Sequence, residues 1–407
     1  MQTADTSNLI RSEAELLLEE SRKQKAERTK NLGSPIETPG KALGIEIREN
    51  IAWIAENTGV ARTLDLETGK TLQLFRGHSA PVTCLAFIER EASAGGPILV
   101  TGSWDKTIKL WNAGTKELIS STPAHSDFVK TLLIIPSLQL LISSSSDKIV
   151  RLWDISTITK GQPLQSVGSI STHTRPVESL IARTASDINV ILYTADTMGI
   201  IKVWELAKKD VQPPRWQTLL LEELKHHRTR VNEMLHNNGQ LWTASSDETI
   251  QMLFHPSPSP SVVPKLKPCP PIIHPAAVRA VLPLALTPLA EPYVLTGAGD
   301  VIRVYDVSSL DEPELLSEVD AHWHDVTALR LWMRRTPIEG SQGEVKVEPW
   351  IVSASLDGTI RKWRLSELLC PPPADKPIAV DPEPKESDSF QMTEEEEREL
   401  AELIDSD

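Results

Sequence analysis

Histidine, hydroxyl and carboxylate side chains recur together in this chain, in a combination that can do chemistry. In the stretch from His78 to Trp111, the histidine is followed by Thr101 and then by Asp105. A serine or threonine, a histidine and an aspartate are also the groups of a hydrolase triad. A nucleophile, however, normally occurs once, in a strained and exposed turn. Here the same trio returns along the chain, so the repetition favours a structural role over catalysis.

Two histidine clusters raise the question of a metal site, namely His226-His227 and His322-Trp323-His324. Structural and catalytic zinc sites combine imidazole with thiolate or carboxylate ligands at fixed spacing. Neither cluster has such companions, and His227 and His322 also belong to the repeat described below. The chain has no P-loop, no GxGxxG motif in a strand–helix context, no HExxH motif and no CxxC pair. We therefore expect no catalytic residues, no cofactor and no metal.

Six segments of the chain begin with the same pattern. Each has a histidine, a valine four residues later and an apolar residue seven residues later. The histidines are His78, His125, His173, His227, His274 and His322, and the valines are Val82, Val129, Val177, Val231, Val278 and Val326. Consecutive histidines are 47, 48, 54, 47 and 48 residues apart. A repeat of slightly over 40 residues fits the four-stranded blades of a propeller.

The segment from Gly77 to Trp111 resembles a WD40 repeat. It opens with Gly-His, places Asp105 in a turn and ends on a strand that alternates apolar and polar residues. In this family an indole N–H donates to a hydroxyl, and an imidazole links that hydroxyl to the turn carboxylate. The resemblance assigns such tetrads to three blades: His78, Thr101, Asp105 and Trp111; His125, Ser143, Asp147 and Trp153; His322, Ser353, Asp357 and Trp363.

The other blades depart from this pattern, and the departures put their tetrad hydrogen bonds in doubt. Blade 4 has Met198 in place of the turn aspartate, although Asp196 is nearby. Blade 5 has Leu253 in place of the tryptophan. Blade 6 keeps the histidine, the hydroxyl and the aspartate, but Tyr305 replaces the tryptophan with one residue fewer. Blade 1, about residues 41–76, has no tetrad and is inferred from its neighbours and its turn spacing.

The resemblance implies an all-β fold, a seven-bladed WD40 β-propeller over residues 41–370. Residues 1–40 are expected to form an N-terminal extension and linker, with a helix from about Leu9 to Lys30. Residues 371–407 are expected to be an acidic, largely disordered tail with a short amphipathic helix that begins near Thr393. Both helices could be solvated extensions or docking elements for partners.

Ring closure requires a fourth strand for blade 7, and three segments could supply it. They are residues 365–369, 377–380 and part of 31–40. WD40 rings usually close with an N-terminal strand beside the last blade, so we favour the N-terminal segment.

Two insertions interrupt the repeats. The stretch from His255 to Pro275 contains eight prolines, which lack the N–H donor that a regular strand needs. It is expected to run as a surface loop between blades 5 and 6, with a docking peptide as the alternative. The second insertion, from Arg334 to Glu348, is interpreted as a polar loop within blade 7.

Charge and cysteine content restrict the class of protein. The formal charge is −14, and residues 375–407 hold 13 acidic and 3 basic residues, which leaves about −4 for the remainder. Neither part has the basic footprint of a nucleic-acid binder, so direct nucleic-acid contact is not expected. Three cysteines without metal spacing indicate a reducing compartment. With no signal peptide and no apolar span, the sequence predicts a cytoplasmic or nuclear protein with no membrane segment.

Four residues are candidates for partner binding. In WD40 relatives the turn before the tetrad aspartate and the loop entering the first strand share one rim of the ring. The matching positions here include Trp104, Phe128, Arg175 and Arg230, which are of residue types common at interfaces. The leading hypothesis is a non-enzymatic scaffold or adaptor, a monomeric ring that binds other proteins within a larger complex.

Three alternatives remain open. A substrate receptor of a ubiquitin ligase would usually have an arginine soon after Trp153-Asp154, where this chain has Ser156. A subunit of an RNA or ribosome-assembly complex would bind mainly through protein contacts. A propeller enzyme would need a polar, charged central pocket, and nothing in the sequence favours one.

Overall fold

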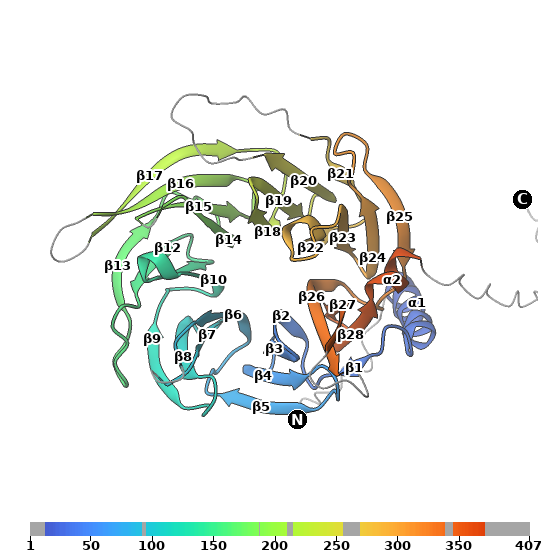
Figure 1. Cartoon of the computed structure of the whole chain (residues 1–407), viewed down its shortest axis with the longest axis horizontal. Helices are drawn as coiled ribbons and strands as arrows, with labels where there is room; N and C mark the ends of the chain where they lie inside the picture. Colours follow the sequence, from blue (N-terminus) through green and yellow to red (C-terminus); the bar gives the residue numbers. More distant parts are fainter. Residues whose placement is uncertain are drawn as a thin grey trace, which may run out of the picture. The chain divides into compact units, whose positions relative to one another are not determined.

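The computed structural model describes residues 13–91, 95–186, 188–209, 215–254, 269–337 and 345–370. These residues form seven four-stranded antiparallel sheets that follow one another around a central axis (Figure 1). This arrangement confirms the predicted seven-bladed β-propeller. Among the described residues no helix is long and apolar enough to cross a membrane.

The first four blades follow the chain in order. Blade 1 contains β2 (Ala42–Arg48), β3 (Ile51–Glu56), β4 (Val60–Asp65) and β5 (Thr71–Arg76). Blade 2 contains β6 (Val82–Ile88), β7 (Ile98–Ser103), β8 (Thr107–Asn112) and β9 (Leu118–Pro123). Blade 3 contains β10 (Val129–Ile135), β11 (Leu140–Ser145), β12 (Val150–Asp154) and β13 (Gln165–Ile170), with the 3-10 turn η3 (Pro136–Leu138) after β10. Blade 4 contains β14 (Val177–Thr184), β15 (Asn189–Asp196), β16 (Ile201–Lys209) and β17 (Arg215–Leu224).

The last three blades complete the ring. Blade 5 contains β18 (Val231–Asn237), β19 (Gln240–Ser245), β20 (Thr249–Phe254) and β21 (Ile272–Ile273). Blade 6 contains β22 (Val278–Pro283), β23 (Tyr293–Ala298), β24 (Val301–Asp306) and β25 (Glu314–Val319), with the 3-10 turn η4 (Leu284–Leu286). Blade 7 contains β26 (Val326–Pro337), β27 (Val345–Ser355), β28 (Thr359–Arg364) and β1 (Ile36–Glu37). Two helices, α1 (Glu13–Thr29) and α2 (Leu365–Leu369), lie outside the sheets.

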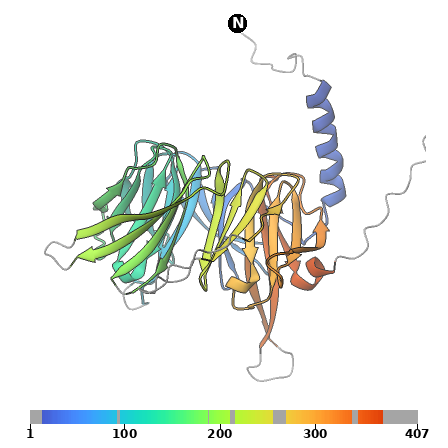
Figure 2. The ribbon, with the colours of Figure 1, turned by 90° about the horizontal axis from the view of Figure 1, so that it is seen from above.

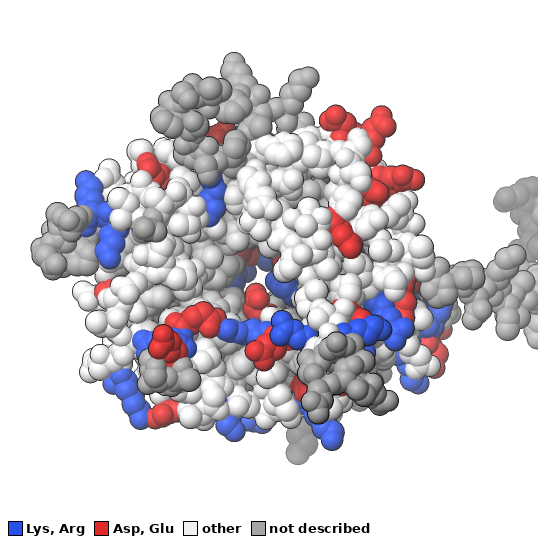
Figure 3. Space-filling view, viewed as in Figure 1, with Lys and Arg blue, Asp and Glu red and all other residues white. Residues whose placement is uncertain are grey.

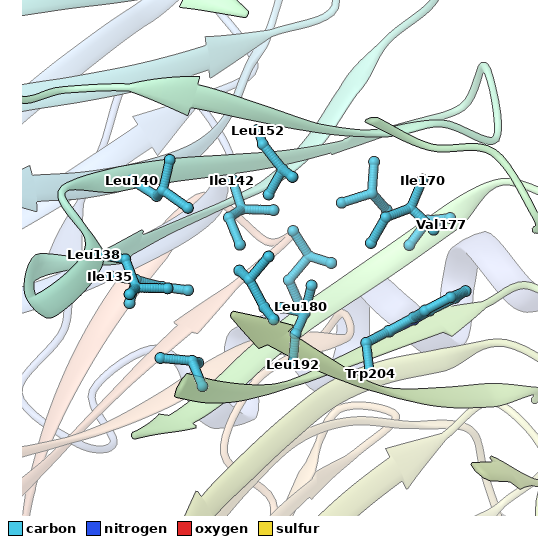
Figure 4. Packing of buried hydrophobic residues seen from close by; sticks show 13 residues of the cluster. Ile135, Leu138, Leu140, Ile142, Leu152, Ile170, Val177, Leu180, Leu192 and Trp204 are labelled. Carbon is cyan, nitrogen blue, oxygen red and sulfur yellow. The ribbon is translucent and has the colours of Figure 1, made fainter. Parts of the chain in front are cut away.

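The first strand of each blade faces the central axis, and the seven first strands contact one another in sequence around the ring. Six of these strands begin at the valine of the repeat, and each of these valines is fully buried. Apolar side chains then fill the space between neighbouring blades. Between blades 3 and 4, for example, Ile142 and Leu152 pack toward Leu180, Leu192 and Trp204 (Figure 4). The repeat therefore predicted both the strand starts and the core.

Blade 1 folds without a tetrad because a buried ion pair links its second and third strands. The Arg62 guanidinium donates two hydrogen bonds to the Glu56 carboxylate and one to Thr71 Oγ1, at 2.8 Å. Glu56 is fully buried, and Leu64 lies in the core at the tryptophan position. A paired and hydrogen-bonded charge is tolerated in such a place.

The N-terminal segment closes the ring, as predicted. β1 pairs with β28 through Ile36 opposite Ile360 and Glu37 opposite Thr359. Residues 365–369, one of the alternatives, form the helix α2 instead. Residues 377–380 lie outside the described residues, as do the acidic tail and its expected helix. The domain boundary at residue 40 stays a prediction, although residues 36–37 pair within blade 7.

The two insertions differ from expectation where the structure describes them. Ile272 and Ile273 pair with Ile250 and Thr249, so the last part of the proline-rich stretch does form a strand. Residues 255–268 lie outside the described residues. Both ends of the segment interpreted as a polar loop in blade 7 are strand, because β26 and β27 stay paired out to Pro337 and Val345, while residues 338–344 lie outside the described residues. That prediction was wrong because long strands can continue through polar sequence when each N–H finds a cross-strand carbonyl.

Helix α1 stands on one face of the ring (Figure 2). Lys25 Nζ lies 2.8 Å from Asp300 and 2.9 Å from Asp320, and Arg28 lies 2.7 Å from Asp320. The helix ends at Thr29, one residue before the predicted end, and the predicted start at Leu9 lies outside the described residues. Asp300 is in the β23–β24 turn, so α1 rises from the face that carries the second turn of every blade.

Candidate functional site

The structure brings together the residues of the three tetrads that the sequence assigned. In blade 2, His78 Nδ1 lies 2.7 Å from Asp105 and His78 Nε2 lies 2.7 Å from Thr101 Oγ1, to which Trp111 donates its indole N–H at 2.9 Å. The tetrads of blades 3 and 7 repeat this geometry with distances of 2.7–3.0 Å. The three hydroxyl-bearing residues are fully buried. A buried hydroxyl that accepts an indole N–H is not placed to attack a substrate.

The tetrads also fix the ionisation of their members. The Asp357 carboxylate sits in the interior, where burial alone would raise its pKa, but hydrogen bonds and the proximity of His322 hold the pKa at about 2. Burial lowers the pKa of His322 and of His125. Each aspartate is therefore ionised and each of these two imidazoles neutral at pH 7, as a chain of hydrogen bonds from indole to carboxylate requires.

Blade 4 has a complete tetrad, which corrects the doubt raised by Met198. Asp196, two residues before the expected position, lies 3.1 Å from His173 Nδ1. Its other oxygen accepts the backbone N–H groups of Met198 and Ile200, and so shapes the turn. His173 Nε2 and the Trp204 indole meet Thr194 Oγ1 at 2.7 and 2.9 Å. A carboxylate from the last residue of β15 thus fills the same role.

We expect Asp196→Ala to lower the free energy of unfolding by about 2 kcal/mol, because it removes the partner of a buried imidazole and of two N–H groups. Urea-induced unfolding followed by tryptophan fluorescence measures this change. The matched control is Asp300→Ala in blade 6, which is expected to lower the free energy of unfolding by well under half of that amount. Equal effects of the two changes would contradict the assignment of Asp196 to the tetrad.

Blade 5 compensates for its missing tryptophan with a second histidine. Thr243 Oγ1 lies 2.7 Å from His227 Nε2 and 3.1 Å from His226 Nε2, and His227 Nδ1 lies 3.2 Å from Asp247. Burial, reinforced by the neighbouring His227, lowers the pKa of His226 to about 3. His226 is therefore neutral at pH 7, and its ring N–H can donate to the hydroxyl as an indole would. The His-His pair is part of the blade, and among the described residues no group of three or more His, Cys, Asp or Glu could hold a metal ion.

Blade 6 does not form the tetrad that its sequence implies. His274 Nε2 lies 3.0 Å from Thr296 Oγ1, and Tyr305 packs edge-on against the imidazole. Asp300, however, pairs with Lys25 of α1 rather than with His274. The β23–β24 turn has only two residues, Gly299 and Asp300, against three in blade 2. The shorter turn explains why this aspartate does not reach the histidine.

The rim predicted from the sequence exists as seven equivalent pairs of loops. In each blade the turn between the second and third strands donates a backbone N–H to the loop that enters the first strand. Trp104 donates to Pro81 O, Ser146 to Phe128 O, Thr197 to Pro176 O and Ser246 to Arg230 O, and the same contact recurs in blades 1, 6 and 7, all at 2.9–3.1 Å. All four partner-binding candidates therefore lie in these loop pairs, on the face from which α1 rises.

Trp104 and Phe128 stack on each other across the border between blades 2 and 3. Their ring centroids are 4.9 Å apart and their planes are inclined by 20°. Trp104 is 39% exposed and Phe128 is 37% exposed. The sequence singled out both residues separately, but only the structure shows that they form one aromatic surface.

The two arginines lie in the next two blades, in different environments. Arg230 forms an ion pair with Glu178 at 2.6 Å, and Lys130 approaches the same buried carboxylate at 3.3 Å. Arg175 is exposed in the loop that precedes β14. Glu178 of blade 4 thus links Lys130 of blade 3 to Arg230 of blade 5.

The face drawn in Figure 3 has a hollow at the centre of the ring and carries both basic and acidic side chains. Many of the basic groups of the propeller have a carboxylate beside them. Arg334, for example, forms two hydrogen bonds of 2.8 Å to Glu67. Arg330 reaches from blade 7 to Glu233 of blade 5 at 2.9 Å. These pairs link blade 7 to its neighbour blade 1 and, past blade 6, to blade 5.

Comparison with known proteins agrees with this geometry. The family model described as WD domain, G-beta repeat, matches residues 69–112 and 116–154. A WD repeat-containing protein of Schizosaccharomyces pombe is 28% identical over 416 residues, which cover 99% of this chain and 100% of that protein. Together with the seven blades and the tetrads of blades 2, 3, 4 and 7, these matches identify the repeats. The chain contains WD40 repeats.

Other similarities are partial. The nuclear distribution protein PAC1 of Coccidioides posadasii is 35% identical over 114 residues, 24% of each chain. The small ribosomal subunit protein RACK1y of Oryza sativa is 25% identical over 169 residues, 41% of this chain and 44% of that protein. The computationally designed Ika8 protein superposes with a TM-score of 0.54 at 22% identity, over 80% of this chain and 83% of that one, which shows the fold alone. WD40 propellers generally act as scaffolds for other proteins and are generally not catalytic.

Proposed function

We propose that this WD40 protein is a non-enzymatic scaffold or adaptor that holds a partner protein against the Trp104–Phe128 surface. The observation that carries the proposal is the exposed stack of two large aromatic rings on rigid loops. Aromatic side chains of this kind are typical anchors of protein interfaces, because they bury much area at little cost in side-chain entropy. We place the protein in the cytoplasm or nucleus, as a monomeric ring within a larger complex.

The mechanism rests on rigidity. The turn that carries Trp104 is held by Asp105, whose carboxylate accepts the backbone N–H groups of Ser79 and Thr107 in addition to the imidazole of His78. Asp127 Oδ1 accepts the N–H of Phe128 and shapes the loop of the second ring. Because both loops are ordered before a partner arrives, binding does not have to pay for ordering them. Helix α1 on the same face offers a further point of contact.

The proposal predicts that Trp104→Ala combined with Phe128→Ala removes partner binding without unfolding the ring. Loss of two anchors should cost at least about 2 kcal/mol, or roughly thirtyfold in affinity. Affinity purification of the tagged full chain, followed by quantitative mass spectrometry, measures the recovery of partners.

The matched control is Leu219→Ala combined with Leu221→Ala, on the outer strand β17, where both leucines are about half exposed. This control removes a comparable exposed apolar surface elsewhere on the ring. Recovery of the same partners in the same amounts by the aromatic double variant would overturn the proposal.

A further inference from the structure

We infer that the rim continues across blades 4 and 5 as a site for an acidic segment of the partner that also carries an apolar residue, with Met198 as the apolar contact and Arg175 and Arg228 as the charge contacts. The inference rests on the proposed function, because it names the chemistry of the partner that the rim would hold. It adds Met198 and Arg228 to the residues that the sequence pointed to.

Met198 occupies the turn position that a tetrad aspartate takes in other blades. In blade 2 that position is Asp105, and its carboxylate is engaged by His78. In blade 4 Asp196 supplies the carboxylate from two residues earlier, so position 198 is released from the tetrad. The released position carries a large apolar side chain that is 49% exposed. A flexible thioether is well suited to an irregular apolar partner surface.

The Met198 turn lies between two arginine-bearing loops. Thr197 donates its backbone N–H to Pro176 O at 3.1 Å, beside Arg175. On the other side, Gly199 packs against the backbone of His227 and Thr229, on either side of Arg228. Gly199 has a φ of +78°, and this left-handed backbone conformation together with the close approach requires glycine. The turn that carries Met198 is thus held between the two loops that carry Arg175 and Arg228.

The charge that this part of the rim presents to solvent is cationic. Among the described residues, no carboxylate pairs with the side chain of Arg175 or Arg228, and both residues are exposed. The carboxylates of Asp196 and Asp247 are buried and take up backbone and imidazole donors. Glu248 is the exposed acidic residue of the adjoining turn. Guanidinium groups bind carboxylates through paired hydrogen bonds, which favours an acidic partner segment.

This cationic part adjoins the aromatic surface. Lys130 of blade 3 and Arg230 of blade 5 meet at Glu178 of blade 4, so blades 3 to 5 are continuous at the rim. A partner segment lying along it would meet two aromatic rings and then a thioether with a guanidinium group on either side. An amphipathic acidic peptide matches that order, whereas a nucleic acid would gain little from the apolar part.

The inference is tested by selecting peptides from a displayed random library on the full chain. Peptides with clustered Asp or Glu and at least one large apolar residue are expected to be enriched. The affinity of an enriched peptide, measured by fluorescence anisotropy, should fall about tenfold or more in Arg175→Glu combined with Arg228→Glu, and severalfold in Met198→Ala. Salt should weaken the wild-type complex more than that of the charge-reversed variant. The control is Arg76→Glu, at an exposed position on β5.

The outcomes separate this inference from the function on which it rests. Loss of partners in the Trp104/Phe128 double variant, with unchanged binding in the Arg175/Arg228 and Met198 variants, would overturn the inference and leave the proposed function intact. No enrichment of acidic peptides would also overturn it, as would binding of single-stranded RNA that depends on Arg175. Thermal unfolding of each variant checks that the ring is intact, and all three positions are exposed enough for this to be expected.

Discussion

Replacing Arg361 with alanine is expected to detach the N-terminal segment from blade 7 and to lower the free energy of unfolding by about 3 kcal/mol. The guanidinium of Arg361 is only 2% exposed and donates to the carbonyl oxygens of Thr29 and Leu32, the latter at 2.8 Å. Its Nε donates to Thr359 Oγ1 at 3.2 Å. Hydrogen bonds from a charged donor contribute about 1.5–3 kcal/mol each, and buried carbonyls left without donors add a penalty.

The effect is large because few other hydrogen bonds hold the segment from Thr29 to Thr38 against blade 7. β1 contributes only two residues, and beyond them Gly33 O accepts from Lys362 N at 2.6 Å and Thr38 N donates to Gly358 O at 2.9 Å. When the segment leaves, the outer edge of β28 loses its partner strand and becomes open to unwanted pairing.

Urea unfolding and limited proteolysis of the full chain measure this prediction together. Arg361→Ala should lower the unfolding midpoint and expose the segment around residues 29–40 to cleavage while the other blades still resist it. Arg364→Ala is the matched control, since the Arg364 side chain is 56% exposed at the end of the same strand. An unchanged midpoint with unchanged protease resistance would show that Arg361 does not hold the segment.

The strand starts and the tetrads could be predicted from the sequence because their residues contact other residues of the same blade. The histidine and valine of each repeat fix where the first strand starts, and the hydroxyl, aspartate and tryptophan belong to hairpins of the same sheet. Such contacts are local, so a pattern of spacings is enough to find them. The sequence left the tetrad of blade 4 in doubt, with Met198 at the aspartate position and Asp196 nearby, because spacing does not show that turns of different shape can bring a carboxylate to the same imidazole.

The repeat pattern could not predict the contacts between blades or the contacts of the N-terminal helix with the ring. The stacking of Trp104 on Phe128 joins two blades, and the pairing of Lys25 with Asp300 joins a helix to a turn far along the chain. Both depend on the relative placement of whole elements, which spacing does not encode. The exposure of Met198 could have been suspected, because a large apolar residue at a turn position needs a reason, but its setting between two arginines required the structure.

The second prediction with a large effect is a loss of stability at acid pH. We expect the free energy of unfolding to fall steeply between pH 6.5 and pH 4.5, because several histidines are buried in the neutral form. Burial lowers the pKa of His226 to about 3 and, with the nearby Arg303, that of His274 to about 4. Burial also lowers the pKa of His125, His227 and His322.

The direction follows from which state binds more protons. An unfolded histidine takes up a proton below its ordinary pKa of about 6.5, whereas the folded one does not until its lowered pKa is reached. Below pH 6.5 the unfolded state therefore holds more protons, and stability decreases with falling pH by about 1.4 kcal/mol per pH unit for each such histidine. His226 and His274 together should remove about 4 kcal/mol or more by pH 4.5, a large part of the stability of an ordinary domain.

The tetrad carboxylates act at lower pH and in the same direction. Asp357, with its pKa held at about 2, stabilises the fold above the ordinary aspartate pKa, and that contribution is lost as the pH falls from about 4 toward 2. As the pH is lowered, the loss of stability caused by the buried histidines should therefore appear first, and the loss caused by the tetrad aspartates should follow at lower pH.

Urea unfolding of the full chain at a series of pH values between 7.5 and 4.5 measures the slope directly. In His226→Gln the amide can still donate to Thr243, but the side chain no longer titrates. The free energy of unfolding of this variant is expected to change less with pH, by about 1.4 kcal/mol per pH unit, which is the contribution of one proton. This holds whatever its stability at pH 7.5. Leu219→Ala, which changes no titratable group, should keep the wild-type slope. A slope in His226→Gln equal to that of the wild type would mean that His226 does not stay neutral in the folded ring, and its role as the donor that replaces the indole of blade 5 would then fail as well.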